Sequence, residues 1–249
     1  MSAPRPLSLA VVGRGRMGRL VEAVARERGH RVELALSAAE NPDGAGLNAQ
    51  SLAGIDLAIE FSTPAAAPRN VEACLERGVS VLTGTTGWAD AEGAARLGML
   101  AERSGAALLI APNFALGVLL FRLLVRRAAE LLAGDDQGFD LWIEETHHKG
   151  KRDAPSGTAL ALAEDVLGRM PGLRREELPV RSTRGGHEPG LHRVVLDATD
   201  ETIELVHRAR SRRVFAVGAV RAAEWLGGRT ELTGLVGLED MMRESEGEA

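Results

Sequence analysis

The chain has 249 residues, a formal net charge of −5 and 45% hydrophobic residues, which fits one large or two modest globular domains with a substantial core. The acidic balance argues against a general nucleic-acid binder, and the 3% of aromatic residues argue against a stacking surface for single strands. Cys74 is the only cysteine and no apolar run suits a signal peptide or a bilayer span, so we expect a cytoplasmic protein without disulfides, cysteine metal clusters or membrane partners.

The first 110 residues alternate apolar runs with helix-like segments. Strands are predicted over 7–12, 31–36, 55–61, 79–84 and 106–111. The apolar spacing after residue 16 predicts a first helix that ends near Gly29. One further helix is expected to start near Pro68, and another is expected to end near Arg103. The composition of residues 38–53 predicts a loop with at most a short helix. Because this alternation is typical of βαβ units, we expect a parallel sheet with right-handed crossovers.

The pattern changes near residue 114. A long helix is predicted over 115–132, then a "GDDQG" loop, a strand over 139–145 and a helix over 156–169. A loop over 183–192 precedes two alternating runs within 193–209, which predict an antiparallel hairpin, and an amphipathic helix is expected over 215–226. We therefore expect an α/β chain. Residues 1–113, with 214–249 folding back onto them, would form a Rossmann-type domain, and 114–213 an α+β domain with a mixed sheet.

A glycine-rich loop lies between the first predicted strand and the first predicted helix. Gly13, Gly15 and Gly18 form the pattern G-x-G-x-x-G in the context that a dinucleotide fingerprint requires. We expect Gly13 to make the turn, Gly15 to let a pyrophosphate approach the backbone and Gly18 to let the helix pack on the strand. The free N–H groups at the helix start would then bind phosphates, so the loop predicts a nicotinamide cofactor.

The choice between NADH and NADPH depends on the end of the second predicted strand. NAD-selective sites usually place an acid there for the ribose hydroxyls, whereas this sequence has Ser37, with Glu40 just beyond. Arg14 and Arg16 lie inside the glycine loop, where they can meet a 2′-phosphate. We expect NADPH to be accepted and favour it slightly over NADH. The alternative is that both arginines are merely solvated.

Three further loops follow predicted strands at their carboxyl ends. They read "FSTP" from Phe61, "GTTG" from Gly84 and "APNF" from Ala111. Ligands in open α/β sheets bind along this edge, so the loops are expected to line the nicotinamide half of the cofactor and the domain crevice. The alternative is that they are ordinary turns.

The stretch "ETHHKGKRDAPSGTA" at 145–159 concentrates cations and histidines before a helix start. The helix dipole and the hydroxyls of Ser156 and Thr158 favour an anion such as a carboxylate. A lysine crowded by other cations releases its proton more readily, so Lys151 is a candidate general acid, and a histidine can shuttle a proton. Adjacent histidines cannot chelate one metal as an i, i+4 pair does, so no metal site is expected. A solvated basic loop is the alternative.

This stretch resembles the pattern E-x-H-H-x-x-K-x-D-A-P-S-G-T-A of the 4-hydroxy-tetrahydrodipicolinate reductase family, also called dihydrodipicolinate reductases. The resemblance extends through "GRMG", "FSTP", "GTTG" and "APNF" to "SRRVFAVGAVRAAEWL", and so covers nearly the whole chain. It implies a homotetramer built on a Rossmann domain and a substrate-binding and tetramerisation domain. It also implies that NADH or NADPH reduces a cyclic dicarboxylate in lysine and diaminopimelate biosynthesis.

The resemblance assigns roles to individual residues. It implies that His147 is a proton donor or acceptor and Lys151 a proton donor. The substrate-binding positions it implies are His148, Gly157 and Thr158. The cofactor-binding positions are Gly13, Arg14, Gly15, Arg16, Met17, Gly84, Thr85, Thr86, Ala111, Pro112, Asn113 and Phe114. There are three departures: the loop "GRGRMG" is one residue shorter than the family's G-x-x-G-R-M-G, Ala115 replaces a common serine, and Gly150 replaces a bulkier residue.

Other classes of protein are less compatible with the sequence. A redox-sensing regulator would need a DNA-binding module or a basic surface, and neither is visible. A dehydrogenase acting on a sugar or an amino-acid semialdehyde is a second alternative. Semialdehyde oxidation needs a nucleophilic cysteine, whereas Cys74 lies inside a predicted helix. A binding-only pseudoenzyme is disfavoured because Lys151 and both histidines are present.

Overall fold

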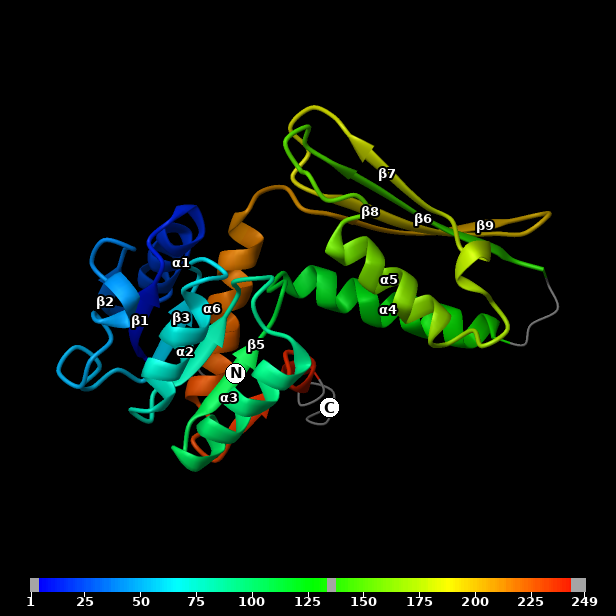
Figure 1. Ribbon diagram of the computed structural model, residues 1–249. Coiled ribbons are helices and arrows are strands. Elements are labelled where there is room, and N and C mark those ends of the chain that lie inside the picture. Colours follow the sequence, from blue (N-terminus) through cyan, green and yellow to red (C-terminus); the bar gives the residue numbers. More distant parts are fainter. Residues whose placement is uncertain (1–4, 134–137, 243–249) are drawn as a thin grey trace. The chain divides into compact units, whose positions relative to one another are not determined.

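The structure, a computed structural model that describes residues 5–133 and 138–242, divides into two units (Figure 1). The first contains the described residues up to Ala115 and those from Phe215 onward, and the second contains the described part of Leu116–Val214. The predicted "GDDQG" loop lies almost wholly outside the described residues. No described helix is long and apolar enough to cross a membrane.

The first unit is built on a six-stranded sheet in which all neighbouring strands are parallel. The strand order is β10-β5-β4-β3-β1-β2. The strands are β1 (Ser8–Val12), β2 (Arg31–Leu36), β3 (Leu57–Glu60), β4 (Ser80–Thr83), β5 (Ala107–Ile110) and β10 (Gly234–Val236). From β1 the chain proceeds to β2 on one side and to β3 on the other. Beside β1 the order therefore reverses, and ligands of open α/β sheets bind at the carboxyl ends of the strands at such a point.

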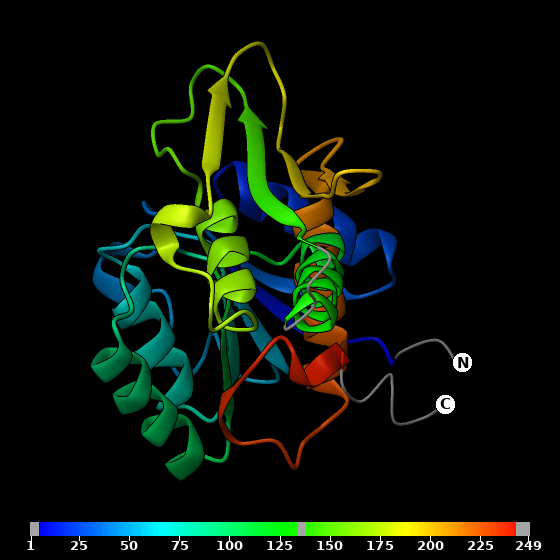
Figure 2. The same ribbon diagram turned by 90° about the vertical axis from the view of Figure 1, so that its right-hand side faces the viewer.

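Helices cover both faces of this sheet. In Figure 2, α2 (Ala67–Leu75) and α3 (Ala91–Arg103) lie together on one side, and α1 (Arg16–Glu27) lies on the other. The last helix, α6 (Arg213–Gly227), is tied to the segment after α1, because Glu224 accepts hydrogen bonds from Arg28 at 2.7 and 2.8 Å. Cover on both faces explains why every residue of β1 and β3 is buried, without the alternation of a half-exposed strand.

The second unit is a four-stranded mixed sheet in the order β7-β6-β8-β9. Its strands are β6 (Asp140–His147), β7 (Val180–Arg184), β8 (Leu191–Asp197) and β9 (Thr202–Arg208). Only the β6–β7 pair is parallel. Along β6 the residues Leu141, Ile143, Glu145 and His147 are buried, and the residues between them are half-buried. The buried face packs on α4 (Leu116–Leu132) and α5 (Gly157–Leu167), which Figure 1 shows on one side of this sheet.

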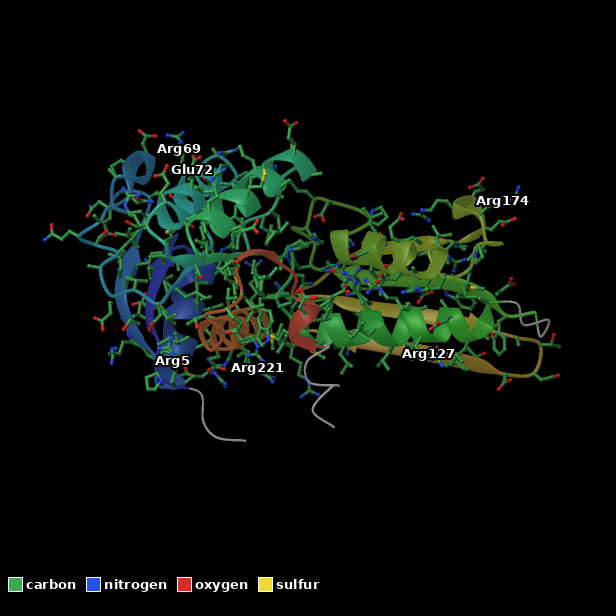
Figure 3. All side chains as sticks on the ribbon, turned by 90° about the horizontal axis from the view of Figure 1, so that it is seen from below. Arg5, Arg69, Glu72, Arg127, Arg174 and Arg221 are labelled. Atoms are coloured by element: carbon green, nitrogen blue, oxygen red, sulfur yellow. The ribbon has the colours of Figure 1, made fainter. Side chains whose placement is uncertain are left out.

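A buried ion pair joins the two helices of the second unit. Asp165 of α5 accepts hydrogen bonds from Arg122 at 2.6 and 3.0 Å and from Arg126 at 2.5 Å, both on α4. Some other ion pairs of this unit lie in solvent. In Figure 3, Arg127 and Arg174 project from the surface, where they pair with Glu130 and Glu177. Exposed pairs of this kind contribute about 1 kcal/mol or less.

The predicted fold class is confirmed, with three local differences. Strand β6 runs to His147, so His147 lies on the strand rather than after it. Strand β7 falls partly in a predicted loop, because its sequence, "VRSTR", is polar and lies at a sheet edge. Strand β10 has only three residues and was not predicted. In 38–53 the structure has one 3₁₀ turn, Pro42–Gly44, and a second, Arg175–Glu177, precedes β7.

Candidate active site

In the glycine loop, two glycines are required by the fold and the third leaves room for a ligand. Gly13 has φ +94°, and a Cβ there would collide with the carbonyl of Phe61. A Cβ at Gly18 would collide with the carbonyl of Gly13. At Gly15 a Cβ would meet nothing within 4 Å. Packing therefore explains Gly13 and Gly18, whereas open space lies at Gly15, the N-cap of α1, where a phosphate is expected to approach.

The loops after β3, β4 and β5 each begin with a main-chain hydrogen bond to the last residue of the neighbouring strand. Phe61 donates to Val12 at 2.8 Å, Gly84 to Glu60 at 3.0 Å and Ala111 to Thr83 at 3.1 Å. The ring of Phe61 packs edge-on against Phe114, with 6.0 Å between the ring centroids. Gly84 is needed here, because a Cβ would collide with the Phe61 ring. These contacts bring Phe61, Gly84, Ala111 and Phe114 together at one edge of the sheet.

The other predicted residues of these loops differ in exposure. Thr86 and Pro112 are exposed. Asn113 accepts a hydrogen bond from the Ala115 N–H at 2.9 Å. The Thr85 hydroxyl is buried without a hydrogen-bond partner among the described residues. Such a hydroxyl is a ready donor for a bound ligand.

A buried carboxylate that the sequence prediction did not include organises this edge. Glu60 ends β3 and is 1% exposed. It accepts hydrogen bonds from the Ser62 N–H at 2.9 Å, from the Ser62 hydroxyl and from the Thr83 hydroxyl at 2.6 Å. Asn70 of α2 in turn donates to the Ser62 hydroxyl at 3.1 Å. Glu60 therefore fixes the loop after β3 to the end of β4.

Glu40, just beyond the end of β2, is held against Ser37. Glu40 accepts hydrogen bonds from the Ser37 N–H at 2.8 Å and from the Ser37 hydroxyl at 2.6 Å. These bonds lower the pKa of Glu40, and the charge of Arg14 lowers it further. Arg14 itself forms an ion pair with Glu22 at 3.1 Å. Arg16 is exposed and has no ion-pair partner within the described ranges.

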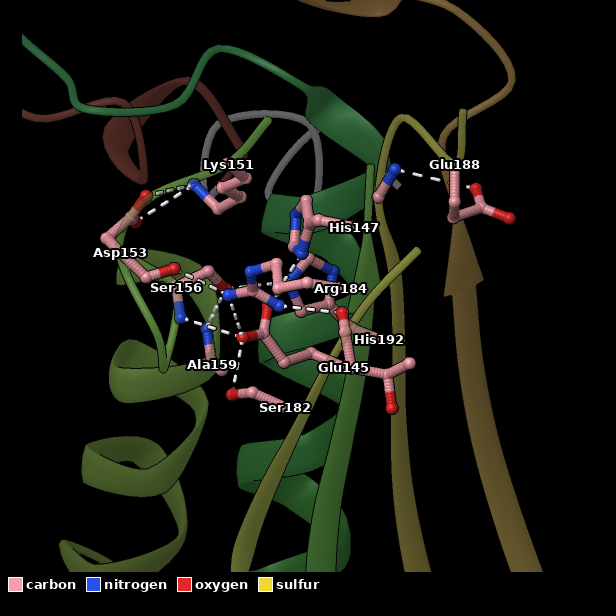
Figure 4. A network of polar contacts seen from close by, with 12 residues as sticks. Glu145, His147, Lys151, Asp153, Ser156, Ala159, Ser182, Arg184, Glu188 and His192 are labelled. Carbon is pink, nitrogen blue, oxygen red and sulfur yellow. Dashed lines mark hydrogen bonds and ion pairs between the residues drawn. The ribbon is translucent and has the colours of Figure 1, made fainter. Parts of the chain in front are cut away.

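Glu145 is the centre of the polar network in the second unit (Figure 4). Its side chain is fully buried, and Oε1 accepts hydrogen bonds from the Ser156 N–H at 3.0 Å, Ser182 at 2.7 Å and Arg184 at 2.7 Å. Burial alone would raise the pKa of Glu145, but these hydrogen bonds outweigh it and lower the pKa to about 2. The carboxylate is therefore an anion at neutral pH.

Two histidines lie beside this carboxylate. The Nδ1 of His147 is 2.7 Å from Oε2 of Glu145, close enough for a hydrogen bond although not aligned for one. The ring of His192, from β8, packs edge-on against His147 at 5.1 Å, and its Nε2 is 3.2 Å from the Ser156 hydroxyl. Burial lowers the pKa of His192 to about 4, and burial also lowers the pKa of His147. Both rings are neutral at pH 7.

The amino end of α5 adjoins these rings. Ser156 is the N-cap, and its hydroxyl accepts a hydrogen bond from the Ala159 N–H at 3.2 Å. Gly157 and Thr158 form the first turn, at the positive end of the helix dipole. The Nζ of Lys151 donates to the carboxylate of Asp153 at 2.9 Å, and the Lys151 side chain is 24% exposed. Figure 4 draws this contact. The ring of His148 accepts a 3.2 Å hydrogen bond from the Gly150 N–H.

The second unit thus gathers all six of its predicted site residues around the end of β6 and the start of α5. Sequence reasoning missed Glu145 as a functional side chain, together with Ser182, Arg184 and His192. Alternation along β6 was a usable signal for Glu145, because it places that residue on the same face as His147. No comparable signal existed for the others, which come from strands that pair with β6 only in the fold.

Glu145, His147 and His192 also offer donor atoms within 4.8 Å of one another, a spacing that can hold a metal ion. The fit is poor. Arg184 donates to the same carboxylate, and the Glu145 oxygen facing the rings is already in contact with His147. The cationic guanidinium disfavours a second cation beside the carboxylate. The absence of a metal site stays a prediction.

Comparison with known proteins points to one family. The sequence model described as "Dihydrodipicolinate reductase, N-terminus" matches residues 7–114, and the one described as "Dihydrodipicolinate reductase, C-terminus" matches 117–242. A 4-hydroxy-tetrahydrodipicolinate reductase from Christiangramia forsetii is 36% identical over 95% of this chain and 98% of its own. One from Archaeoglobus fulgidus is 38% identical over 92% and 96%.

Solved structures show the same fold. The dipicolinate-bound dihydrodipicolinate reductase from Paenisporosarcina sp. TG-14 has a TM-score of 0.74 at 24% identity, over 94% of this chain and 98% of that one. An engineered D-amino acid dehydrogenase bound to NADP⁺ has a TM-score of 0.53 at 13% identity, over 94% and 93%. Since both halves match the family and relatives above 30% identity cover nearly all of it, this chain belongs to the dihydrodipicolinate reductase family and is an oxidoreductase.

Proposed function

We propose that the chain is a 4-hydroxy-tetrahydrodipicolinate reductase of lysine and diaminopimelate biosynthesis. Loss of water from the hydroxylated ring gives dihydrodipicolinate, and a hydride plus a proton reduce this to tetrahydrodipicolinate. The observation that carries the proposal is the buried carboxylate of Glu145, which His147 and the amino end of α5 contact, with Lys151 paired to Asp153 in the loop between β6 and α5. It occurs in a chain whose other unit has the glycine loop of a dinucleotide-binding sheet.

The cofactor is proposed to bind the first unit, and when bound it supplies the hydride. The N-terminus of α1 and the loop at Gly13–Met17 would hold the pyrophosphate, with Gly15 leaving the room that a backbone–phosphate contact needs. Phe61, Phe114 and the loops beginning at Gly84 and Ala111 would hold the nicotinamide end.

The structure offers support for both cofactors. Glu40, bonded to Ser37, is suited to ribose hydroxyls, which favours NADH. Arg16 has no ion-pair partner in the described ranges and is suited to a 2′-phosphate, which favours NADPH. Arg14 is held by Glu22 and is less available than the sequence suggests. We therefore propose dual use of NADH and NADPH.

The substrate is proposed to bind the second unit through its carboxylates. The first-turn amides at Gly157 and Thr158 would bind an anion, and His148 and Ser156 would add polar contacts. Lys151 is proposed to donate the proton to the ring carbon next to the one that receives hydride, while Asp153 holds its ammonium group. His147, being neutral, is proposed to accept or return a proton at the same centre.

The assembly and location are also proposals. The sheet face turned away from α4 and α5 carries Trp142, Val195 and Val206, and the last of these is 51% exposed. We propose that this face mediates a homotetramer. We further propose residues 1–113 with 214–249 as the dinucleotide-binding domain, and 114–213 as the substrate-binding and oligomerisation domain. The cytoplasmic location stays a prediction.

A semialdehyde dehydrogenase is not supported. Burial raises the pKa of the Cys74 thiol to about 12, and the side chain is inside α2. A thiol of this kind is not a nucleophile near neutral pH. The chain therefore lacks the group on which semialdehyde oxidation would depend.

The proposed function is tested by following NADH and NADPH oxidation while a synthase makes the substrate in situ from pyruvate and aspartate semialdehyde. Wild type is compared with Lys151→Ala and with Lys149→Ala, which removes an exposed lysine two residues away. We expect turnover in wild type and in Lys149→Ala, and a loss of at least about 100-fold in Lys151→Ala with cofactor affinity retained. Folded wild type that binds either cofactor but does not turn over would contradict the proposal.

A further inference from the structure

His147 has two ring nitrogens, and only one of them can act on a substrate. Burial lowers the pKa of the ring, so at neutral pH it carries a single N–H. Which nitrogen carries that proton decides whether the outward nitrogen accepts or donates. The proton-handling role proposed above therefore depends on the tautomer.

We propose that Glu145 is a positioning residue that fixes the proton of neutral His147 on Nδ1 and leaves Nε2 as the acceptor facing the substrate. This inference rests on the proposed function and deepens it. Glu145 acts through His147 and is not proposed to touch the substrate.

The argument for the tautomer comes from the contact itself. Oε2 of Glu145 is 2.7 Å from Nδ1, and both atoms are buried with no other hydrogen-bond partner in the described part of the chain. A bare nitrogen lone pair at that distance from a carboxylate oxygen would be strongly repelled. A proton on Nδ1 turns the repulsion into attraction, even though the contact is bent. The second nitrogen of a neutral ring is then unprotonated.

The surroundings keep the carboxylate in place and charged. Oε1 of Glu145 accepts three hydrogen bonds, from Ser156 at the start of α5 and from Ser182 and Arg184 of β7. The groups that face His147 are Glu145 on its own strand, Arg184 from β7, His192 from β8 and Lys151 from the loop before α5. Glu145 is the one anion among these four. It alone can hold a proton on the ring nitrogen nearest to it.

The same carboxylate also fixes the start of α5. Its Oε1 receives the N–H of Ser156, the residue that caps the helix. Glu145 therefore contacts both the helix end that is proposed to bind substrate carboxylates and the ring that is proposed to handle the proton. This link explains why a charged group is retained at a fully buried position, where charge is costly unless it is well bonded.

The Nε2 side of the ring is kept open by a glycine. A Cβ built at Gly190 would lie 3.1 Å from Nε2 of His147. The nitrogen that the Glu145 contact leaves unprotonated is thus the one beside which residue 190 carries no side chain.

The test uses the full-length protein with Glu145→Gln, Glu145→Asp and the control Glu164→Gln, which changes an exposed glutamate on α5. Two quantities are measured: kcat and KM as functions of pH, and the ¹⁵N signals of histidine-labelled protein, with His147 assigned by its loss in His147→Gln. Glutamine keeps the size of the side chain but removes the charge.

We expect Glu145→Gln to lower kcat about 100-fold with a smaller change in KM, and to change the pH dependence of kcat. Glu145→Asp should restore part of the rate. In wild type the ¹⁵N spectrum should show the proton on Nδ1, and in Glu145→Gln a mixture of tautomers. Glu164→Gln should match wild type in every measurement.

The outcomes separate this inference from the proposed function. Wild type with its His147 proton on Nε2 would overturn the inference, and this needs no variant to fold. Unchanged kcat and pH dependence in folded Glu145→Gln would overturn it as well. Absence of wild-type turnover contradicts the proposed function instead, and the spectrum then still decides the tautomer.

Discussion

The hydroxyl of Thr83, at the end of β4, donates a 2.6 Å hydrogen bond to the buried carboxylate of Glu60, at the end of β3. Thr83→Val keeps the shape of the side chain and removes this donor. We expect the free energy of unfolding to fall by about 1–3 kcal/mol, because a buried carboxylate loses one of its partners. Cofactor affinity should also fall, since Glu60 fixes the loop that begins at Phe61. Denaturant unfolding and cofactor titration by fluorescence measure the two effects.

Thr230→Val is the matched control for this prediction. It makes the same substitution at an exposed position of the same unit, outside the loops expected to bind the cofactor. Its stability and cofactor affinity should equal those of wild type. If Thr83→Val behaves like Thr230→Val, the Glu60 network does not organise the cofactor-binding edge.

Gly15→Ala should weaken cofactor binding without changing the stability of the fold. A Cβ at Gly15 meets nothing within 4 Å, and its φ of −78° suits alanine. The melting temperature should therefore stay within about 2 °C of wild type, as for a substitution of less than 0.5 kcal/mol. If a pyrophosphate approaches the backbone there, affinity for both nicotinamide cofactors should fall at least tenfold. Calorimetric titration of each cofactor makes the measurement.

Gly84→Ala provides the contrast. A Cβ there collides with the ring of Phe61, so both stability and cofactor affinity should decrease. Equal affinities of wild type and Gly15→Ala for the cofactor would remove the proposed phosphate site from the glycine loop.

The order of helices and strands could be predicted because the apolar periodicity of each segment and the glycines at its ends are local features of the sequence. Gly13 and Gly18 are required by backbone contacts within the loop, so their spacing indicated the strand–turn–helix unit. Strand β7 could not be predicted, since its polar sequence is held at the edge of the sheet by pairing with β6. Because β6 and β7 are far apart in the sequence, their pairing produces no periodic pattern within β7 itself.

The candidate site was predictable only in part, for the same reason. His147, Lys151 and Ser156 lie in one short stretch, and their chemical character was visible in the sequence. Arg184 and His192 reach Glu145 and Ser156 from other strands. Glu60 was missed, and Glu40 was noted but not assigned to the ribose, because single acids near strand ends are common. Only their hydrogen bonds to Thr83 and Ser37 distinguish them.

The stability of the protein should depend on pH through His192. Burial lowers the pKa of His192 to about 4 in the folded state, against an ordinary value of 6.5. The unfolded chain therefore binds its proton first as pH falls. The contribution, about 3 kcal/mol, is complete above pH 6.5 and is lost progressively toward pH 4. Below about pH 4.5, Glu145 adds to the loss, because its pKa is lowered to about 2 in the folded state.

Urea unfolding at a series of pH values measures this dependence. In His192→Gln the free energy of unfolding should vary less between pH 6.5 and pH 4 than in wild type. His187→Gln, at an exposed loop position, serves as the control and should retain the wild-type slope. Parallel curves for wild type and His192→Gln would show that His192 is not held neutral by the fold.

Asp165→Ala should be among the most destabilising substitutions in the second unit. The carboxylate is buried, and its loss leaves Arg122 of α4 without its bidentate partner on α5. We expect a loss of about 3 kcal/mol. Glu130→Ala removes an exposed partner of Arg127 on the same helix and should cost less than about 1 kcal/mol. Thermal unfolding of both variants gives the comparison, and equal losses would show that the buried pair does not join the helices.

Gly190→Ala tests where His147 acts. The new methyl group would lie 3.1 Å from Nε2, tighter than ordinary van der Waals contact, so either the ring shifts or the approach to Nε2 narrows. In both cases kcat/KM should fall about 10- to 100-fold, because small displacements of a reacting group are costly. Gly172→Ala, which meets nothing within 4 Å in an exposed loop, is the control. Steady-state kinetics and a melting curve are recorded for both. A stable Gly190→Ala with wild-type kcat/KM would mean that the substrate does not approach Nε2, and the proton-handling role would then pass from His147 to Lys151 alone.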